Sequence, residues 1–174
     1  DDYIYSICKI LDQPGNPRKI KVNNSISELT GSSLRYLYTG LDIKNKLNLN
    51  KVINIVEIGA GYGGQSVILD KILPIENYFY VDLPEVNQLI DRFVGNFNVN
   101  FNYTFNTLED KFDFDSEFDL VISNYAFSEL PRNLQNLALN KIINNSKNGY
   151  MIINSHGLEK NIFLKKYDLH TVDE

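Results

Sequence analysis

The sequence of 174 residues is poor in the features that mark secreted, membrane-spanning and nucleic-acid-binding proteins. Its single cysteine, Cys8, excludes an intrachain disulfide framework and fits a reducing compartment, where we expect it to be a small buried apolar side chain. No apolar run is long enough to cross a bilayer, and no signal-peptide pattern opens the chain. The 17 basic residues are outnumbered by 22 acidic ones and form no cluster that would neutralise phosphates. We therefore expect a cytoplasmic protein with a small-molecule substrate and no nucleic-acid partner.

The rest of the chain is organised around residues 52–64, which read VINIVEIGAGYGG. Apolar and mostly β-branched side chains fill nearly every position from Val52 to Ile58, as in a strand covered on both faces by helices. Four glycines follow within six residues, and apolar side chains then recur at helical spacing through Leu73. Glycines let the backbone approach a ligand closely, and the first N–H groups of the helix would face that ligand. The segment predicts a strand, loop and helix that bind a nucleotide-like cofactor.

The glycine spacing satisfies two cofactor patterns. Gly59, Gly61 and Gly64 fit the dinucleotide pattern G-x-G-x-x-G, which alone is a weak signal. Gly59, Gly61 and Gly63 also follow Glu57 in an acidic-x-G-x-G-x-G pattern. A carboxylate in that place would repel a pyrophosphate, but it suits a ligand that carries an ammonium and a sulfonium. These glycines and Glu57 are therefore the expected cofactor-binding residues. The alternative for Glu57 is a structural role, which would require a buried partner such as a backbone amide or an arginine.

Four segments of the sequence resemble S-adenosylmethionine-dependent methyltransferases with a Rossmann-like fold, and most closely a bacterial family assigned as sugar O-methyltransferases. They are Val56–Gln65, Asp82–Val86, Ser123–Leu130 and Gly149–Asn154, and they cover roughly the middle two-thirds of the chain. The resemblance implies S-adenosylmethionine as cofactor, S-adenosylhomocysteine as product, and a sugar or glycan precursor as substrate. The alternatives are a nicotinamide-dependent oxidoreductase and a catalytically inactive cofactor-binding partner domain.

Strands and helices alternate along the chain. The predicted strands cover residues 52–58, 78–81, 99–105, 118–123 and 150–153. The predicted helices cover 1–12, 30–47 with Thr30 as N-cap and an interruption at Gly40, the stretch after the glycines through Leu73, 84–94, and 131–144, which is followed by the helix-ending pair Asn148-Gly149. This alternation implies an α/β fold of the Rossmann-like, doubly wound type, with a mostly parallel sheet and helices on both faces.

Two divisions of the chain are expected. Residues 1–50 form an N-terminal helical segment that, by the resemblance, lies over the cofactor cleft, and residues 51–174 form the α/β core. Asp1 is not an initiator residue, so we expect the sequence to be a fragment. A methyltransferase sheet ends in an antiparallel pair of strands, and few residues remain after the fifth predicted strand to form them. We therefore expect the C-terminal strands to be truncated, and the exposed sheet edge to favour a homo-oligomer.

Four further residues are candidates for holding the cofactor. Asp82 follows the second strand, where a carboxylate accepts both ribose hydroxyls, and its alternative role is to cap the helix that begins at Pro84. Thr107 or Glu109 would meet the adenine amino group, unless this is an ordinary solvated loop. By the resemblance, Arg35 would clamp the methionine carboxylate with two hydrogen bonds, and its alternative is a surface arginine.

Three residues are candidates for catalysis. Asn124 follows the fourth strand, where its amide would hold the cofactor or the substrate hydroxyl. His156 follows the fifth strand and is the expected general base, because an imidazole is largely unprotonated near neutral pH. Glu129 is the alternative base if burial raises its pKa. The acidic run from Asp110 to Asp119 enters a strand at its amino end, so we expect a solvated charged loop there and no metal site.

Overall fold

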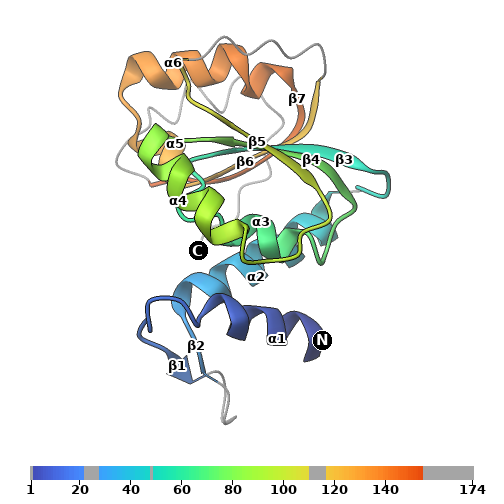
Figure 1. Ribbon diagram of the computed structural model, residues 1–174. Coiled ribbons are helices and arrows are strands. Elements are labelled where there is room, and N and C mark those ends of the chain that lie inside the picture. Colours follow the sequence, from blue (N-terminus) through green and yellow to red (C-terminus); the bar gives the residue numbers. More distant parts are fainter. Residues whose placement is uncertain (1, 22–27, 48, 110–116, 155–174) are drawn as a thin grey trace.

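The computed structural model describes residues 2–21, 28–47, 49–109 and 117–154 (Figure 1). Its centre is a five-stranded sheet in the order β5-β4-β3-β6-β7, in which every neighbouring pair is parallel. The strands are β3 (Ile53–Ile58), β4 (Ile75–Val81), β5 (Asn102–Asn106), β6 (Phe118–Asn124) and β7 (Ser146–Ile152). The predicted α/β, Rossmann-like fold with a mostly parallel sheet is confirmed.

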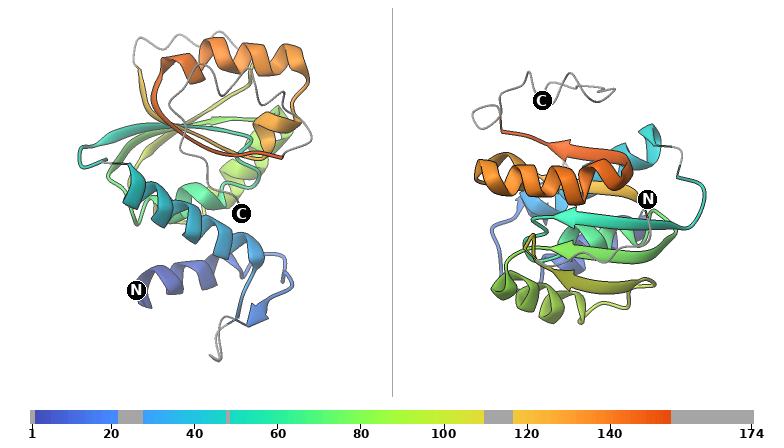
Figure 2. Two further views of the ribbon diagram at one scale, coloured as in Figure 1. Left: turned by 180° about the vertical axis from the view of Figure 1, so that it is seen from behind. Right: turned by 90° about the horizontal axis from the view of Figure 1, so that it is seen from above.

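Helices cover both faces of the sheet (Figures 1 and 2). One face packs against α2 (Gly31–Lys46), α3 (Gly64–Leu69) and α4 (Pro84–Val94), with α1 (Asp2–Leu11) as an outer layer. The other face packs against α5 (Ala126–Glu129), α6 (Arg132–Lys141) and the 3₁₀ turn η1 (Ile143–Asn145). Among the described residues, no helix combines the length and the apolar character that crossing a membrane requires.

Alternation along β3 divides the core into two layers. Ile55 is fully buried among side chains of the α2–α4 side, whereas Val56 is fully buried among those of the α6 side. Side chains of a strand alternate between faces, so a strand buried on both faces is apolar at nearly every position. Glu57 is the one charged residue in β3, and the same alternation turns it toward α2 and α3.

The N-terminal segment is tied to the core by a buried carboxylate. Asp12, which is 2% exposed, follows α1 and accepts hydrogen bonds from the Thr30 N–H (2.6 Å), the Thr30 hydroxyl (2.7 Å) and the Ser33 hydroxyl (2.5 Å). Thr30 is the N-cap of α2, as predicted, and its Oγ1 accepts from the Ser33 N–H. A small antiparallel pair of strands, β1 (Ile20–Lys21) and β2 (Glu28–Leu29), precedes this cap and was absent from the sequence prediction. The hydrogen bonds of Asp12 with Thr30 and Ser33 set where α2 begins.

Two glycine predictions were wrong. Helix α2 continues through Gly40 without interruption. This glycine faces the core so closely that a Cβ atom would lie 2.8 Å from Ile72 Cδ1. Its small size lets α2 approach α3. Gly149 does not lie at a helix end, because α6 ends at Lys141 and Gly149 pairs with Val121 inside β7.

Several predicted boundaries shift. Helix α3 ends at Leu69 rather than Leu73, because β4 begins at Ile75 and the intervening residues turn toward it. Strand β5 begins at Asn102 rather than Val99. Pro84 is the first residue of α4, as predicted, and α2 follows its expected range within one residue.

Candidate functional site

The candidate site lies where the carboxyl ends of the strands meet. Strand β3 pairs with β4 on one side and with β6 on the other. Successive strands are therefore added to one side of β3 up to β5 and to its other side from β6 on, so the strand order reverses at β3. Open α/β sheets bind ligands in the crevice outside the strand ends at such a switch point. Four groups follow or end the strands β3, β4, β5 and β6 and meet there: the loop from Gly59 to Gly63, Asp82, Asn106 and Asn124.

The glycine loop presents its backbone at one position. Gly59, Gly61 and Gly63 have φ angles of 75°, 62° and 86°, which side chains rarely adopt. A Cβ atom at Gly59 would lie 2.0 Å from the Ala126 Cβ, and one at Gly63 would lie 2.8 Å from Val94, so both are packed against protein. Gly61 is exposed and has nothing within 4 Å of such an atom. A ligand can therefore approach the backbone at Gly61.

Asp82 holds this loop from the end of β4. Its Oδ2 accepts from the Gly61 N–H (3.2 Å) and its Oδ1 from the Leu83 N–H (2.8 Å). Leu83 is the N-cap of α4 and no side chain caps this helix, so the alternative that Asp82 caps α4 is wrong. Partial burial raises the pKa of the Asp82 carboxyl, and its bonds to backbone amides oppose that shift. Each carboxylate oxygen retains a lone pair for a further donor.

Glu57 is buried at the end of β3 and is 2% exposed. Its Oε2 accepts from the Tyr78 hydroxyl (2.6 Å), which is the buried partner that a structural role requires. Burial raises the pKa of the Glu57 carboxyl to about 7, the Tyr78 hydroxyl opposes this shift, and the charge of Asp82 adds to it. No Lys or Arg forms an ion pair with Glu57 among the described residues. A cationic ligand would supply the missing charge.

Arg35 does not point away from the protein as a surface arginine would. Its guanidinium lies 5.5 Å from the centre of the Tyr36 ring and 5.4 Å from that of Tyr125, which places it between α2 and the end of β6. Its Nε is buried and has no hydrogen-bond partner within the described ranges. Tyr125 has a φ of 71°, which is strained for a bulky side chain. Strain of this kind gathers at functional sites.

Two aromatic residues at the site were not predicted from the sequence: Tyr36 of α2 and Tyr62 of the glycine loop. The rings of Tyr36 and Tyr62 meet edge to face at 5.7 Å, and Tyr62 also contacts the Phe93 ring at 4.7 Å. Their places in the sequence mark them only as apolar residues. The sequence does not reveal the contact, because it joins residues from three different elements. This contact fastens the glycine loop to α2.

Asn124 and Gln65 meet behind the strand ends. The Asn124 Nδ2 donates to the Gln65 Oε1 (3.3 Å), and the Gln65 Nε2 donates to the Tyr36 carbonyl (3.1 Å). The Asn124 Oδ1 is buried with no partner among the described residues. Gln65 was not a predicted site residue, because a glutamine in an apolar helical stretch carries no signal of its own.

The remaining predicted residues are Glu129, Thr107 and His156. Glu129 is exposed and accepts from the Asn154 Nδ2 (2.7 Å), which joins the ends of α5 and β7. Thr107 lines a shallow hollow of about 300 Å³ with Asn87 and Asn106, each of which carries a buried side-chain atom without a partner in the part of the chain described. His156 lies outside the described residues, as does most of the acidic run after Glu109. The described residues contain no group of three His, Cys, Asp or Glu side chains suited to a metal ion.

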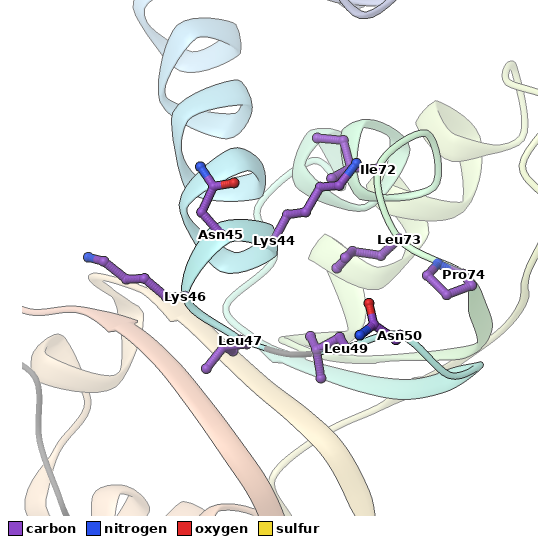
Figure 3. A pocket seen from close by; sticks show the side chains of 9 residues that line it. All are labelled: Lys44, Asn45, Lys46, Leu47, Leu49, Asn50, Ile72, Leu73 and Pro74. Atoms are coloured by element: carbon purple, nitrogen blue, oxygen red, sulfur yellow. The ribbon is translucent and has the colours of Figure 1, made fainter.

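A larger hollow lies at the opposite edge of the sheet (Figure 3). Its volume is about 450 Å³, and its walls come from the end of α2 and from the segments that precede β3 and β4. Apolar side chains such as Leu49 and Leu73 line it beside Lys44. It adjoins the amino ends of the strands, so it is separate from the glycine loop and from Asp82.

The burial of Glu57 predicts an unusual pH dependence of stability. In the folded protein this carboxyl keeps its proton up to about pH 7, whereas in the unfolded chain it loses the proton near pH 4.5. The folded state therefore binds more protons between these values, and its stability falls as the pH rises through them. Relative to Glu57→Gln, the wild type should lose about 3 kcal/mol of unfolding free energy between pH 4.5 and pH 8.

Urea unfolding of both proteins across this pH range measures the difference, and other titrating groups cancel in it. Glu76→Gln, which removes an exposed carboxylate from β4, is the control and should give a nearly constant difference. A constant difference for Glu57→Gln as well would contradict the raised pKa.

Comparison with known proteins identifies the fold. No protein-family model matches the sequence, and no curated protein matches it. A Thermoplasma acidophilum protein of known structure matches with a TM-score of 0.61 and 15% identity, over 94% of this chain and 74% of that chain. A Pyrococcus horikoshii protein proposed to be an RNA methyltransferase matches with a TM-score of 0.59 and 15% identity, over 94% and 78%.

A third solved structure is an S-adenosylmethionine-dependent methyltransferase from Clostridium acetobutylicum, with a TM-score of 0.55 and 14% identity, over 72% of this chain and 53% of that chain. The chain spans less than half the length of two other matched structures, 41% and 43% of their chains. At these identities the likeness concerns the fold alone. The chain has the Rossmann-like α/β fold that is found in an S-adenosylmethionine-dependent methyltransferase.

Proposed function

We propose that this chain binds S-adenosylmethionine and is a methyltransferase that acts on a sugar hydroxyl. The observation that carries the first part is the buried Glu57 carboxylate, which ends the central strand of a methyltransferase-like sheet and has no cation beside it in the described structure. A dinucleotide would bring a pyrophosphate toward this carboxylate, whereas S-adenosylmethionine brings an ammonium and a sulfonium. This favours the methyltransferase over the nicotinamide-dependent oxidoreductase.

Unpaired groups at the site fit the amino-acid end of this cofactor. The Asn124 Oδ1 is a buried acceptor and the Arg35 Nε a buried donor, and neither has a partner in the described part of the chain. A buried polar atom without a partner costs about 1–3 kcal/mol, which a ligand that pairs with it would recover. An α-ammonium would suit Asn124, and an α-carboxylate would suit Arg35, as the sequence resemblance implies.

The nucleoside end fits the neighbouring strand ends. Gly61 admits close approach, and Asp82 has lone pairs left for the ribose hydroxyls. The adenine would then lie toward Asn106 and Thr107, where the hollow beside α4 opens. Gly59 and Gly63 serve this site indirectly, because their lack of a side chain lets α4 and α5 close around the loop.

The proposed reaction is methyl transfer by in-line displacement. When bound, S-adenosylmethionine would supply the methyl group on its sulfonium to the substrate oxygen, with S-adenosylhomocysteine as the product. The protein aligns the two reactants and takes up the hydroxyl proton. The assignment of a sugar as substrate rests on the segments of sequence named above, and the exposed pair of Glu129 and Asn154 supplies polar groups beside the site that suit a hydroxyl-rich ligand.

The cofactor assignment predicts a selective binding experiment. In calorimetry, the chain should bind S-adenosylhomocysteine and show no binding of NAD or NADP. Asp82→Ala should raise the dissociation constant of S-adenosylhomocysteine about tenfold or more, because it loses a charged acceptor. The control is Glu76→Ala, which removes an exposed carboxylate near the amino end of β4, away from the hollow beside α4, and should leave the affinity unchanged. Binding of NAD alone would favour the oxidoreductase, and a lower melting temperature with intact affinity in Asp82→Ala would assign Asp82 a structural role only.

His156 is the proposed general base, with Glu129 as the alternative. His156→Ala should lower turnover by roughly 10²–10⁴-fold while the cofactor affinity stays near that of the wild type. Turnover is measured as S-adenosylhomocysteine released from S-adenosylmethionine in the presence of monosaccharide acceptors. Glu129→Gln is the paired variant, and a loss of turnover in that variant alone would transfer the role to Glu129. Cofactor binding without turnover in the wild type would favour the inactive partner domain.

A further inference from the structure

Gln65 is buried completely, although glutamine is a residue that proteins mostly leave exposed. It is the second residue of α3, directly after the glycine loop. Its side chain extends between two other elements, because it bonds to Tyr36 of α2 and to Asn124 at the end of β6. One side chain thus connects the helix that carries Arg35 with the strand end that carries Asn124.

The hydrogen bonds determine which way each amide faces. The partner in α2 is the Tyr36 carbonyl, which only accepts, so the Gln65 atom that faces it must be the Nε2. The Gln65 Oε1 is then left for Asn124, and the Asn124 atom that faces it must be the Nδ2. The Asn124 Oδ1 therefore turns away from Gln65, and it is the atom that is buried without a partner.

We propose that Gln65 is a positioning residue that presents the Asn124 carbonyl oxygen to the ammonium of the cofactor. This inference rests on the proposed function. If the Asn124 amide turned over, it would present an NH₂ group, which repels an ammonium and leaves the ligand without an acceptor. Gln65 excludes that orientation, because its Oε1 accepts only from the Nδ2. Gln65 thereby favours ligands that have an amino-acid end.

The competing explanation is purely structural: Gln65 only joins α2 to α3. The two explanations differ in ligand selectivity. A structural tie would affect all ligands of the site alike, whereas a positioning role affects only a ligand that carries the ammonium. S-Adenosylhomocysteine carries the amino-acid end, and 5′-methylthioadenosine has the same nucleoside and a thioether without it.

The experiment measures the affinities of both ligands for the wild type, Gln65→Met and Gln65→Glu. The methionine has a similar volume but bonds to neither neighbour, so Gln65→Met should raise the dissociation constant of S-adenosylhomocysteine about 10- to 100-fold and that of 5′-methylthioadenosine less than about twofold. The glutamate retains an oxygen that accepts from the Asn124 Nδ2, so Gln65→Glu should keep the preference for S-adenosylhomocysteine. Gln135→Met is the control, because Gln135 is a buried glutamine of α6, on the other face of the sheet, and donates to the Leu130 carbonyl rather than to either partner of Gln65.

Asn124→Ala alone provides a test that does not depend on the folding of any Gln65 variant, and the double variant adds a second test. Asn124→Ala should reduce the preference for S-adenosylhomocysteine by about as much as Gln65→Met does, and combining the two should cause no further loss. Equal losses for both ligands in Gln65→Met, or an unchanged preference in Asn124→Ala, would overturn the positioning role. A wild type that binds neither ligand would overturn the proposed function and this inference with it. A wild type that binds both with the same affinity would overturn this inference alone.

Discussion

The parallel pairing of β3 with both β4 and β6 is the constraint on which the site depends. Because all three strands run in the same direction, their carboxyl ends lie at one edge of the sheet. The chain moves outward from β3 through β4 to β5, and then from β6 to β7 on the other side. The connections that follow β3 and β6 therefore lead away from each other at this edge. The glycine loop, Asp82 and Asn124 lie around the space between them.

Burial of β3 on both faces makes the charge of Glu57 costly, and the protein meets that cost only in part. The Tyr78 hydroxyl supplies one hydrogen bond, and the pKa of the carboxyl stays raised to about 7. The unpaired atoms of Arg35 and Asn124 lie at the same edge of the sheet. A site with an acceptor, a donor and an uncompensated carboxylate is complementary to a ligand that is a zwitterion with one additional positive charge.

The N-terminal layer contributes to the site through α2. Asp12 fixes the start of this helix by three hydrogen bonds, and Arg35 and Tyr36 follow within two turns. The backbone of Tyr36 then accepts from Gln65, and its ring contacts Tyr62 of the glycine loop. The layer thus belongs to the same core as the sheet and orders two sides of the site.

The features that the sequence predicted are those that depend on neighbouring residues. The run of apolar residues in β3, the spacing of the glycines, the Thr30 cap and Pro84 at the start of α4 are all local patterns. Gly40 and Gly149 were assigned wrongly because glycine usually ends a helix, whereas Gly40 packs against the distant Ile72 and Gly149 pairs with Val121 inside a strand. The contacts of Arg35 with Tyr125 and of Gln65 with Asn124 join residues that are 90 and 59 positions apart, and no local pattern reports them.

The central claim is that the cofactor binds at the carboxyl edge of this sheet, and amide chemical shifts test it most directly. The ¹⁵N-labelled protein is titrated with S-adenosylhomocysteine, and each amide signal is followed. The account predicts that the largest changes occur at Gly61, Leu83 and Tyr125, while Asn45 and Leu73 beside the hollow at the amino edge stay unchanged. Changes confined to Asn45, Leu73 and their neighbours, or no changes at saturating ligand, would contradict it.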